Sequence, residues 1–408
     1  MDIHDKDASH DHSSISKQAE VVVIIVPFPC QSHLNQLLHL SCLITSSYNI
    51  PVHYATTSTH LRQAKHRFNN KTHLQNSQVH FHEFSTPDFV SPSPTPNPST
   101  KFPTHLQPSF ESSIHLRQPM AALLQSISAT ARKVIVIHDV LMAYAVQDIA
   151  NVPNAESYAF SPTSPFSSFF DGWQMKGKPS LEKPPPKGLP SIEGCFSTEI
   201  LHLIALQIDF LKFTTGYIYN SCRSVEGTYI DLIANDQFNR NKLIWSIGPL
   251  NLGADYDRRN SNTPKDKCLE WLDKQAPKSV LYVSFGTTTT MTDEEIKELV
   301  MGLEQMTSST IAKAVQKLIA SKEGEEIRKR AEEQGASTRQ AVEEGGVSRM
   351  ELDSFIAHIT SSYLSCFLYG ESSIIGVKHF FVQTVREGKN YPDALAKRRV
   401  EELEQLVI

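Results

Sequence analysis

The stretch VVVIIVPFPCQSHLNQLLHLSCLI (residues 21–44) decides the fold class. Its opening run, VVVIIV, is continuous and β-branched, which is typical of a strand buried on both faces of a parallel sheet. After the turn Pro27-Phe28-Pro29, leucines at 34, 37, 38 and 40 share one face of a helix. A buried strand that leads directly into an amphipathic helix is the repeating unit of a parallel α/β fold.

Similar units follow along the first 250 residues. Further β-type runs, with helical stretches between most of them, predict strands at Val52–Thr57, Val79–Phe84, Lys133–Asp139, Glu156–Phe160 and Gly216–Ser221. This alternation predicts a doubly wound, Rossmann-like parallel sheet. Two proline-rich stretches, residues 87–108 and 172–194, are expected to be surface loops.

Residues 1–20 (MDIHDKDASHDHSSISKQAE) precede the first predicted strand. They are polar and acidic, which is the wrong composition for a signal or transit peptide. We expect a disordered tail. A weak metal site at His4, His10 and His12 is the alternative.

Composition divides the rest of the chain into four parts. Residues 21–250 contain the strand–helix units of a first domain. Residues 251–267 are polar and have no core-forming side chains, so we expect an interdomain linker there. Residues 268–360 begin a second α/β domain, and residues 361–408 form the C-terminal part.

The second domain begins clearly but is incomplete. The run VLYVSF (Val280–Phe285) predicts a buried strand, and Thr292 and Glu295 form a capping box at the start of a helix. Apolar residues at 296, 299, 300 and 303 predict that one face of this helix packs on the sheet. From Met306 the helical pattern resumes, and no β-type run appears before residue 374. Roughly a hundred residues of an ordinary domain are therefore missing.

The overall composition excludes several function classes. A formal net charge of −5 gives no reason to expect nucleic acid or an anionic membrane as a partner. The 6 cysteines include no CxxC pair, which argues against a zinc site or a disulfide framework and favours a reducing compartment. The apolar run 21–29 is too short to span a bilayer. We therefore expect a cytoplasmic protein. Neither G-x-S-x-G nor H-E-x-x-H occurs, so serine hydrolase and metalloprotease activities find no support.

Two polar residues stand where catalytic groups are expected. His33 lies at the start of the first predicted helix, and Asp139 ends a separate predicted strand, so both should reach the carboxyl edge of one sheet. The helix macrodipole disfavours an imidazolium at His33, and a carboxylate on its far ring nitrogen would fix the tautomer. A general base with its orienting aspartate is one interpretation. A structural helix-start histidine and a strand-end aspartate that caps the next helix is the other.

Two further features have alternative interpretations. The residues Gly286, Thr287 and Thr288 follow a predicted strand, where backbone N–H groups suit a pyrophosphate, although a plain strand–helix turn is also possible. No G-x-G and no Walker A motif occurs in the chain. The aromatic set Phe166, Phe169 and Phe170 would line an apolar acceptor cleft or form part of the core.

Five segments resemble the plant UDP-glycosyltransferases, specifically their zeatin O-glucosyltransferase branch. They are PFPCQSHLNQLLHLS (27–41), VIVIHDVLMAYAVQDIANVPNAESYAF (134–160), YNSCRSVEG (219–227), SVLYVSFGTTTT (279–290) and EEGGVSRMELDSFIAHIT (343–360). They cover most of residues 20–360 in the order of the family. The resemblance implies a GT-B architecture, in which residues 21–250 bind the acceptor and residues 268–360 bind the UDP-sugar.

The resemblance also implies an activity and its residues. The family transfers glucose or another sugar to a hydroxyl of a small plant metabolite, here a cytokinin-like acceptor, with inversion at the anomeric carbon. It maps the catalytic base onto His33, the activating aspartate onto Asp139, and donor contacts onto Ser32 and the Gly286–Thr288 turn. UDP-sugar is then a co-substrate, no cofactor or metal is expected, and the chain is expected to be a monomer.

The chain departs from the family in three places. The signature for UDP-sugar is absent, since none of the 3 tryptophans lies in such a string, and the gap falls between Gln305 and Met306. Ser32 stands where the family usually has glycine. Beyond Thr360 the resemblance stops, so residues 361–408 are a non-family extension. A UDP-glycosyltransferase with impaired turnover is therefore one hypothesis, and a non-catalytic remnant or acceptor-binding protein from a rearranged gene is the alternative. In either case we expect a loosely packed second half.

Overall fold

The fold is taken from a computed structural model of the chain. The structure describes residues 19–69, 79–92, 104–181, 185–236, 239, 241–250, 267–276, 280, 282, 284, 291–305 and 321–361. Backbone contacts divide the chain into two units, Met1–Ile356 and Ala357–Ile408. All side-chain contacts given below lie within the first unit.

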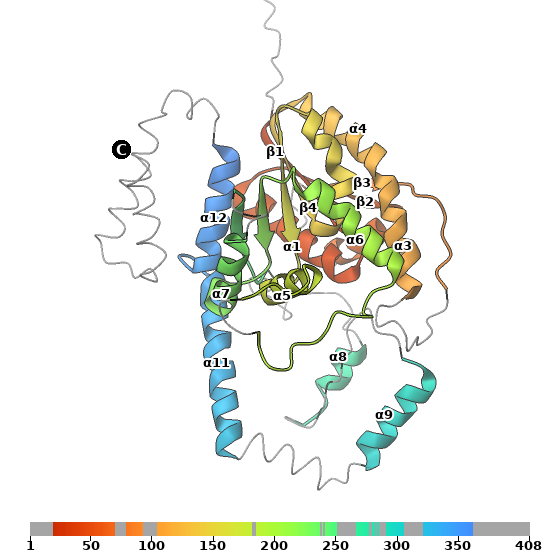
Figure 1. The fold of residues 1–408 in the computed structure, drawn as a ribbon, viewed down its shortest axis with the longest axis vertical. Coiled ribbons are helices and arrows are strands. Elements are labelled where there is room, and N and C mark those ends of the chain that lie inside the picture. Colours follow the sequence, from red (N-terminus) through yellow and green to blue (C-terminus); the bar gives the residue numbers. More distant parts are fainter. Residues whose placement is uncertain are drawn as a thin grey trace, which may run out of the picture. The chain divides into compact units, whose positions relative to one another are not determined.

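A parallel sheet of seven strands forms the centre of the first unit (Figure 1). Every neighbouring pair is parallel, and the strand order is β3-β2-β1-β4-β5-β6-β7. The strands are β1 (Ala19–Val26), β2 (Val52–Thr57), β3 (Val79–Phe84), β4 (Ala131–Asp139), β5 (Ala155–Ser161), β6 (Gly216–Tyr219) and β7 (Leu243–Ser246). The predicted doubly wound α/β sheet is therefore confirmed.

The strand order reverses between β1 and β4. The chain builds outward from β1 through β2 to β3, then returns to the other side of β1 with β4. The β1–β4 register runs from Ala19 opposite Ala131 to Val26 opposite His138, so the two strands end side by side. In doubly wound sheets such a reversal opens a crevice at the carboxyl ends of the strands, where ligands bind.

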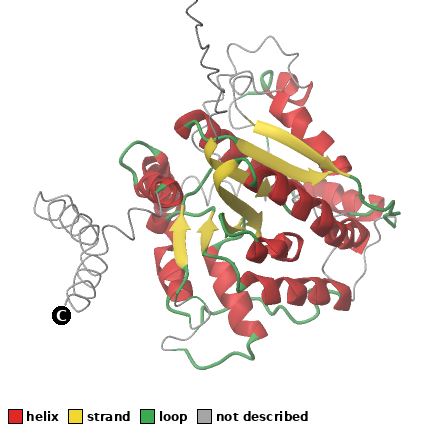
Figure 2. Cartoon of the chain, turned by 90° about the horizontal axis from the view of Figure 1, so that it is seen from above, coloured by secondary structure: helices red, strands yellow, loops and turns green. Residues whose placement is uncertain are grey.

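Helices cover both faces of this sheet (Figure 2). The helices beside the strands are α1 (Gln31–Tyr48), α2 (Ser58–Asn69), η2 (Thr104–Leu106), α3 (Gln107–Ser112), η3 (Ser113–Leu116), α4 (Arg117–Ser128), η4 (Val140–Asn151), α5 (Pro165–Met175), α6 (Thr198–Leu211) and α7 (Arg223–Ala234). On one face α4, η4 and α6 pack on alternate side chains of the central strands, including Ala55. On the other face Tyr54 donates its hydroxyl proton to the Leu34 carbonyl of α1 at 2.9 Å.

The strand boundaries test the sequence predictions directly. The predicted strands Val52–Thr57 and Val79–Phe84 coincide with β2 and β3, and the others agree within a few residues. β7 was not predicted, because its β-type run is short and polar residues flank it. The predicted buried strand Val280–Phe285 is not found at the three positions that the structure describes. Val280, Tyr282 and Ser284 are in no strand, and Tyr282 is 85% exposed, since no described strand lies there to pair with it.

The later helices are α8 (Lys267–Leu272), α9 (Asp293–Gln305), α11 (Lys322–Val342) and α12 (Val347–Thr360). The predicted capping box is confirmed at α9, since Glu295 N–H donates to Thr292 Oγ1 at 3.1 Å and Thr292 N–H donates to Glu295 Oε2 at 2.8 Å. The predicted packing of its apolar face on a sheet is wrong, because Ile296 and Val300 are 46% and 45% exposed. The predicted helix around residues 311–319 lies outside the described residues.

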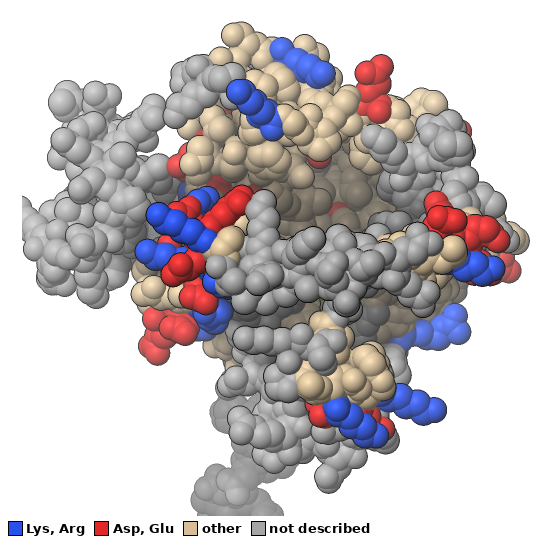
Figure 3. All heavy atoms as spheres, turned by 90° about the horizontal axis from the view of Figure 1, so that it is seen from below, with Lys and Arg blue, Asp and Glu red and all other residues tan. Residues whose placement is uncertain are grey.

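Charged side chains on α11 are mixed in sign. Arg330 pairs with Glu326 and Lys329 pairs with Glu333, each four residues apart on the helix. On the face shown in Figure 3, the coloured basic and acidic residues are likewise interspersed. Among the described residues, no helix is long and apolar enough to cross a membrane.

The part of α12 up to Ile356 packs on the sheet of the first domain. The Phe355 ring is fully buried and lies 5.1 Å from both the Tyr158 and the Trp245 rings, measured between centroids. One turn earlier, Glu351 forms an ion pair with Arg223 and accepts the N–H of Ser246 at 2.7 Å. Burial of an aromatic ring and pairing of a carboxylate therefore hold this helix on β5 and β7.

We expect Phe355→Ala to lower the free energy of unfolding by about 3–5 kcal/mol, because it empties a closed aromatic site. Urea unfolding followed by tryptophan fluorescence would measure this loss. The control is Val347→Ala on the same helix, where the side chain is 38% exposed and a change within about 0.5 kcal/mol is expected. A loss no larger than that of the control would show that α12 does not stabilise the sheet.

Candidate active site

The first turn of α1 carries His33. The strand β1 ends at Val26, and the turn that follows brings Cys30 to extended backbone angles, so that its carbonyl accepts the Leu34 N–H at 2.9 Å and starts the helix. His33 thus lies at the carboxyl end of β1, as predicted. Its side chain is 16% exposed, which leaves the ring partly accessible.

Asp139 is the last residue of β4 and the N-cap of η4. Its Oδ1 accepts the Leu141 N–H at 2.9 Å, so the carboxylate satisfies an N–H at the start of the 3-10 segment. Its Oδ2 accepts the Nδ1–H of His33 at 2.7 Å. The side chain is fully buried. The two predicted residues therefore meet, 106 positions apart in the sequence, and Asp139 both caps a helix and orients the imidazole.

This hydrogen bond determines which ring nitrogen can accept a proton. A buried carboxylate paired with a histidine only accepts hydrogen bonds, so Nδ1 of His33 must carry a proton. In the neutral ring Nε2 is then the basic nitrogen, and it has no hydrogen bond to a described residue. The pair has the geometry of a general base with its orienting carboxylate.

The pKa of His33 reflects two opposing effects. Burial lowers the pKa, but the charge and the hydrogen bond of Asp139 outweigh it, so the pKa lies above the ordinary histidine value. The helix macrodipole was expected to keep the ring neutral by lowering its pKa. The pKa is raised instead, because a buried carboxylate at 2.7 Å acts more strongly than a partial charge at a helix end.

Aromatic side chains adjoin the histidine. The Phe28 ring lies 5.4 Å from the His33 ring, and Phe110 of α3 packs on Phe28 at 4.5 Å. The set that the sequence singled out packs elsewhere. Phe170 is buried and contacts Phe166, Phe169 and Trp173, which favours the interpretation of these aromatics as core between α5 and α7.

The predicted donor contacts stand as follows. Ser32 is exposed in the first turn of α1, with its hydroxyl 3.9 Å from the Cys30 sulfur. Gly286, Thr287 and Thr288 lie outside the described residues. Within the described part of the chain, no group of three or more His, Cys, Asp or Glu side chains is arranged to hold a metal ion.

Two polar residues that were not predicted from the sequence also lie at this edge of the sheet. Gln36 lies one turn after His33 on α1, and Asn220 follows β6. Asn220 Nδ2 donates to Gln36 Oε1 at 2.7 Å. A glutamine three residues after the histidine on a helix was the available signal, since such a pair shares one helix face.

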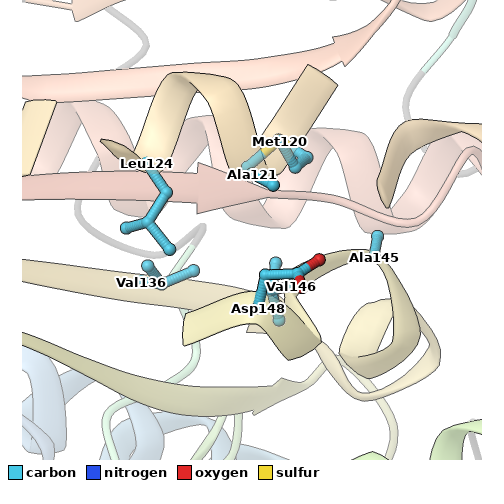
Figure 4. Close-up of a pocket in the computed structure, with 7 residues that line it drawn as sticks. All are labelled: Met120, Ala121, Leu124, Val136, Ala145, Val146 and Asp148. Atoms are coloured by element: carbon cyan, nitrogen blue, oxygen red, sulfur yellow. The ribbon is translucent and has the colours of Figure 1, made fainter. Parts of the chain in front are cut away.

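A small cavity beside β4 is separate from the hydrogen-bonded pair of His33 and Asp139, called the dyad below. It is lined by Met120, Ala121, Leu124, Val136, Ala145, Val146 and Asp148 (Figure 4). Its free volume of about 10 Å³ is space for roughly one water molecule, too little for a metabolite.

The family model described as "Glycosyltransferase, N-terminal domain" matches residues 19–252. A zeatin O-glucosyltransferase of Phaseolus lunatus is 48% identical over 292 residues, which cover 72% of this chain and 61% of that protein. This chain belongs to the plant UDP-glycosyltransferase family. Within the family it falls in the zeatin O-glucosyltransferase-like branch, since a zeatin O-xylosyltransferase of Phaseolus vulgaris is also 46% identical, over 72% of this chain and 62% of that protein.

Solved plant UDP-glycosyltransferase structures share the fold of this family member. A Phytolacca americana enzyme, UGT2, solved with UDP-2-fluoro-glucose and pterostilbene, superposes with a TM-score of 0.61 at 17% identity and covers 84% of this chain and 100% of that chain. A Glycyrrhiza uralensis enzyme, UGT73P12, superposes with a TM-score of 0.63 at 16% identity and covers 88% of this chain and 100% of that chain. The chain described here spans about three fifths of the length of the curated relatives that it matches.

We expect Asp139→Asn to lower the pKa of His33 in this chain, because the carboxylate charge disappears while the burial that lowers the pKa remains. An NMR titration of the His33 ring would measure the change. As a control, Asp148→Asn on η4 removes a carboxylate that pairs with Arg117 instead and should leave His33 unchanged. An unchanged His33 titration in Asp139→Asn would contradict the dyad.

Proposed function

We propose that this chain carries the acceptor-binding and catalytic-base half of an inverting UDP-dependent O-glycosyltransferase. The donor is UDP-glucose, and the acceptor is a hydroxyl of a small plant metabolite, with a cytokinin-like acceptor as the first candidate. The observation that carries the proposal is the 2.7 Å contact between His33 Nδ1 and Asp139 Oδ2 at the carboxyl ends of β1 and β4. The names of the zeatin-transferase relatives support the choice of acceptor.

In the proposed reaction His33 acts as general base. Nε2 of the neutral ring takes the proton of the acceptor hydroxyl while its oxygen forms a bond to the anomeric carbon of the sugar. The bond from that carbon to the phosphate oxygen breaks, and its electron pair leaves with UDP. Attack from the face opposite the leaving group inverts the configuration. Asp139 holds the Nδ1–H and stabilises the imidazolium that forms.

The base lies in a partly apolar setting, which suits a small aromatic or isoprenoid acceptor. Phe28 packs against His33, and Phe110 packs against Phe28, so aromatic rings adjoin the proposed base. The proposed base requires no metal ion, because the imidazole removes the proton and the buried carboxylate compensates its charge. UDP-sugar is a co-substrate here, with no further cofactor.

The proposal also covers the domain organisation of the chain and its contacts with the sugar donor. We propose that residues 21–250 form the acceptor domain, 251–267 a linker, 268–360 an incomplete donor domain and 361–408 a non-family extension. Ser32 and the Gly286–Thr288 turn are the proposed donor contacts. The apolar face of α9 is half exposed, as expected of a domain that lacks its neighbouring strands. We further propose a cytoplasmic, monomeric protein.

Magnitudes favour impaired turnover over full activity. Positioning two substrates supplies roughly 7–11 kcal/mol, whereas a general base contributes about 10²–10⁴ in rate. A chain that holds the acceptor but not the donor keeps only the smaller contribution. The alternative function is therefore a non-catalytic remnant or an acceptor-binding protein from a rearranged gene.

We expect the chain as it stands to bind trans-zeatin but to form no O-glucosylzeatin above the level of a His33→Ala control. Calorimetry would measure acceptor binding, and mass spectrometry would measure product in the presence of UDP-glucose. Product that disappears in His33→Ala would establish this chain as an active enzyme and refute the impairment.

We expect a chimera to restore transfer. It carries the missing segment of the Phaseolus lunatus relative after Gln305. In that chimera His33→Ala should lower kcat/KM by about 10²–10⁴, because the base is lost. The parent kcat/KM should rise with pH through the raised pKa of His33, since only the neutral ring accepts a proton, and Asp139→Asn should move this rise to lower pH. Transfer to flavonoids but not to cytokinins would refute the proposed acceptor class.

A further inference from the structure

A chain of side-chain amides crosses the carboxyl edge of the sheet beside His33. Gln36 lies three residues after His33, on the same side of α1. Its Oε1 accepts the Nδ2–H of Asn220 at 2.7 Å, and its Nε2 lies 3.5 Å from the Pro162 carbonyl, which follows β5. One glutamine thus ties the base-bearing helix to the ends of two neighbouring strands.

The backbone N–H and the side-chain oxygen of Asn220 form further hydrogen bonds that fix the position of this residue. Its backbone N–H donates to the Ser161 carbonyl at 3.1 Å. Its Oδ1 accepts the Leu250 N–H at 2.9 Å, just after β7. Both ends of the Asn220 amide are therefore occupied, so the orientation of the Nδ2–H that points to Gln36 is determined.

The segment after β7 packs tightly against Asn220. At Gly248 an added Cβ would lie 2.3 Å from Asn220 Oδ1 and 2.6 Å from Ser221 N, which no side chain tolerates. Gly248 N–H donates to the Ser221 carbonyl at 2.8 Å, and its own carbonyl accepts the Ser348 hydroxyl of α12 at 2.6 Å. Asn220 cannot move without displacing this segment.

The first turn of α1 lacks two local stabilising features. Its N-cap, Cys30, makes no side-chain cap, and its first turn contains no acidic residue. Contacts with neighbouring elements therefore set the rotation of this turn, among them the hydrogen bond from Tyr54 to the Leu34 carbonyl and the hydrogen bond from Asn220 to Gln36. A rotation of about 10° moves a side-chain tip at a radius of about 5–6 Å by roughly 1 Å, which is enough to break a hydrogen bond.

We propose that Gln36 and Asn220 are positioning residues for the base. Their hydrogen bond sets the rotation of α1 that aims Nδ1 of His33 at Asp139 and leaves Nε2 toward the acceptor. Neither residue touches the reacting atoms, and both act through His33. Asn220 also accepts a hydrogen bond from Leu250, in the segment that follows β7. The position of the base and the position of that segment therefore depend on one side chain. The catalytic meaning of this inference rests on the proposed function, but the positioning itself does not.

The test is an NMR titration of the His33 ring in the full chain, with nitrogen-detected spectra that also report the tautomer. In Gln36→Met, which keeps the side-chain length and removes the amide, we expect the titration midpoint to move at least halfway from the parent value to that of Asp139→Asn. We also expect the Nε2–H tautomer to become detectable, because Nδ1 is no longer held by the carboxylate. Asn220→Ser removes the same hydrogen bond from the other side and should produce the same shift if Gln36→Met does not fold.

The matched control is Gln207→Met on α6. Gln207 is a glutamine in a helix, as Gln36 is, although Gln207 is buried and Gln36 is half-buried. The Gln207 amide accepts the Tyr144 N–H at 2.9 Å and donates to the Leu203 carbonyl at 3.1 Å, within η4 and α6. It should destabilise the fold without moving the His33 titration. A parent-like His33 titration in both Gln36→Met and Asn220→Ser, or an equal shift in Gln207→Met, would overturn the inference. A shift in Gln36→Met alongside an inactive chimera would retain the positioning role and reject the proposed transferase reaction.

Discussion

The parallel pairing of β1 with β4 is the constraint on which the rest of the site depends. Its register places Val26 beside His138, so the residues that follow each strand emerge at one edge. His33 and Asp139 are 106 positions apart, and only this pairing brings their side chains to 2.7 Å. The strand order also reverses there, which in doubly wound sheets is where ligands bind at the strand ends. The location of the site is therefore set by the order and register of the strands.

Burial and charge then decide what the two residues can do. Asp139 is fully buried, yet it accepts hydrogen bonds from His33 and from the Leu141 N–H. The hydrogen bond to this carboxylate keeps a proton on Nδ1 of the ring. The adjacent His138 behaves in the opposite way. Burial lowers its pKa to about 4, so it stays neutral, and this outweighs the opposing effects of Asp139. The ring of His138 is hydrogen-bonded to the backbone carbonyl of Asp139 and not to its carboxylate. The pKa values of His33 and His138 thus differ in direction, because only His33 is hydrogen-bonded to the carboxylate.

The two parts of the chain differ in how completely their apolar faces are covered. In the first domain the strands are buried between helices on both faces, and α12 adds the Phe355 ring to the Tyr158 and Trp245 pair. On α9, by contrast, Ile296 and Val300 stay about half exposed although the capping box formed as predicted. Local signals such as a cap form without a partner, whereas burial requires one. The predicted strand at residues 280–285 fails at its described positions for the same reason, since β structure needs a neighbour to pair with.

The sequence by itself determined the strand–helix alternation, most strand positions, the family and the two residues of the dyad, because these depend on local periodicity and short motifs. β7 was missed because three β-type residues carry too little signal. Only the tertiary structure decided that Phe166 and Phe170 pack against Tyr229 of α7. It likewise decided that Phe28 lies beside His33 and that Phe110 packs on Phe28. It also decided that the pKa of His33 is raised and that Gln36 meets Asn220. These depend on distances between segments far apart in the sequence, which periodicity cannot encode and strand pairing alone sets.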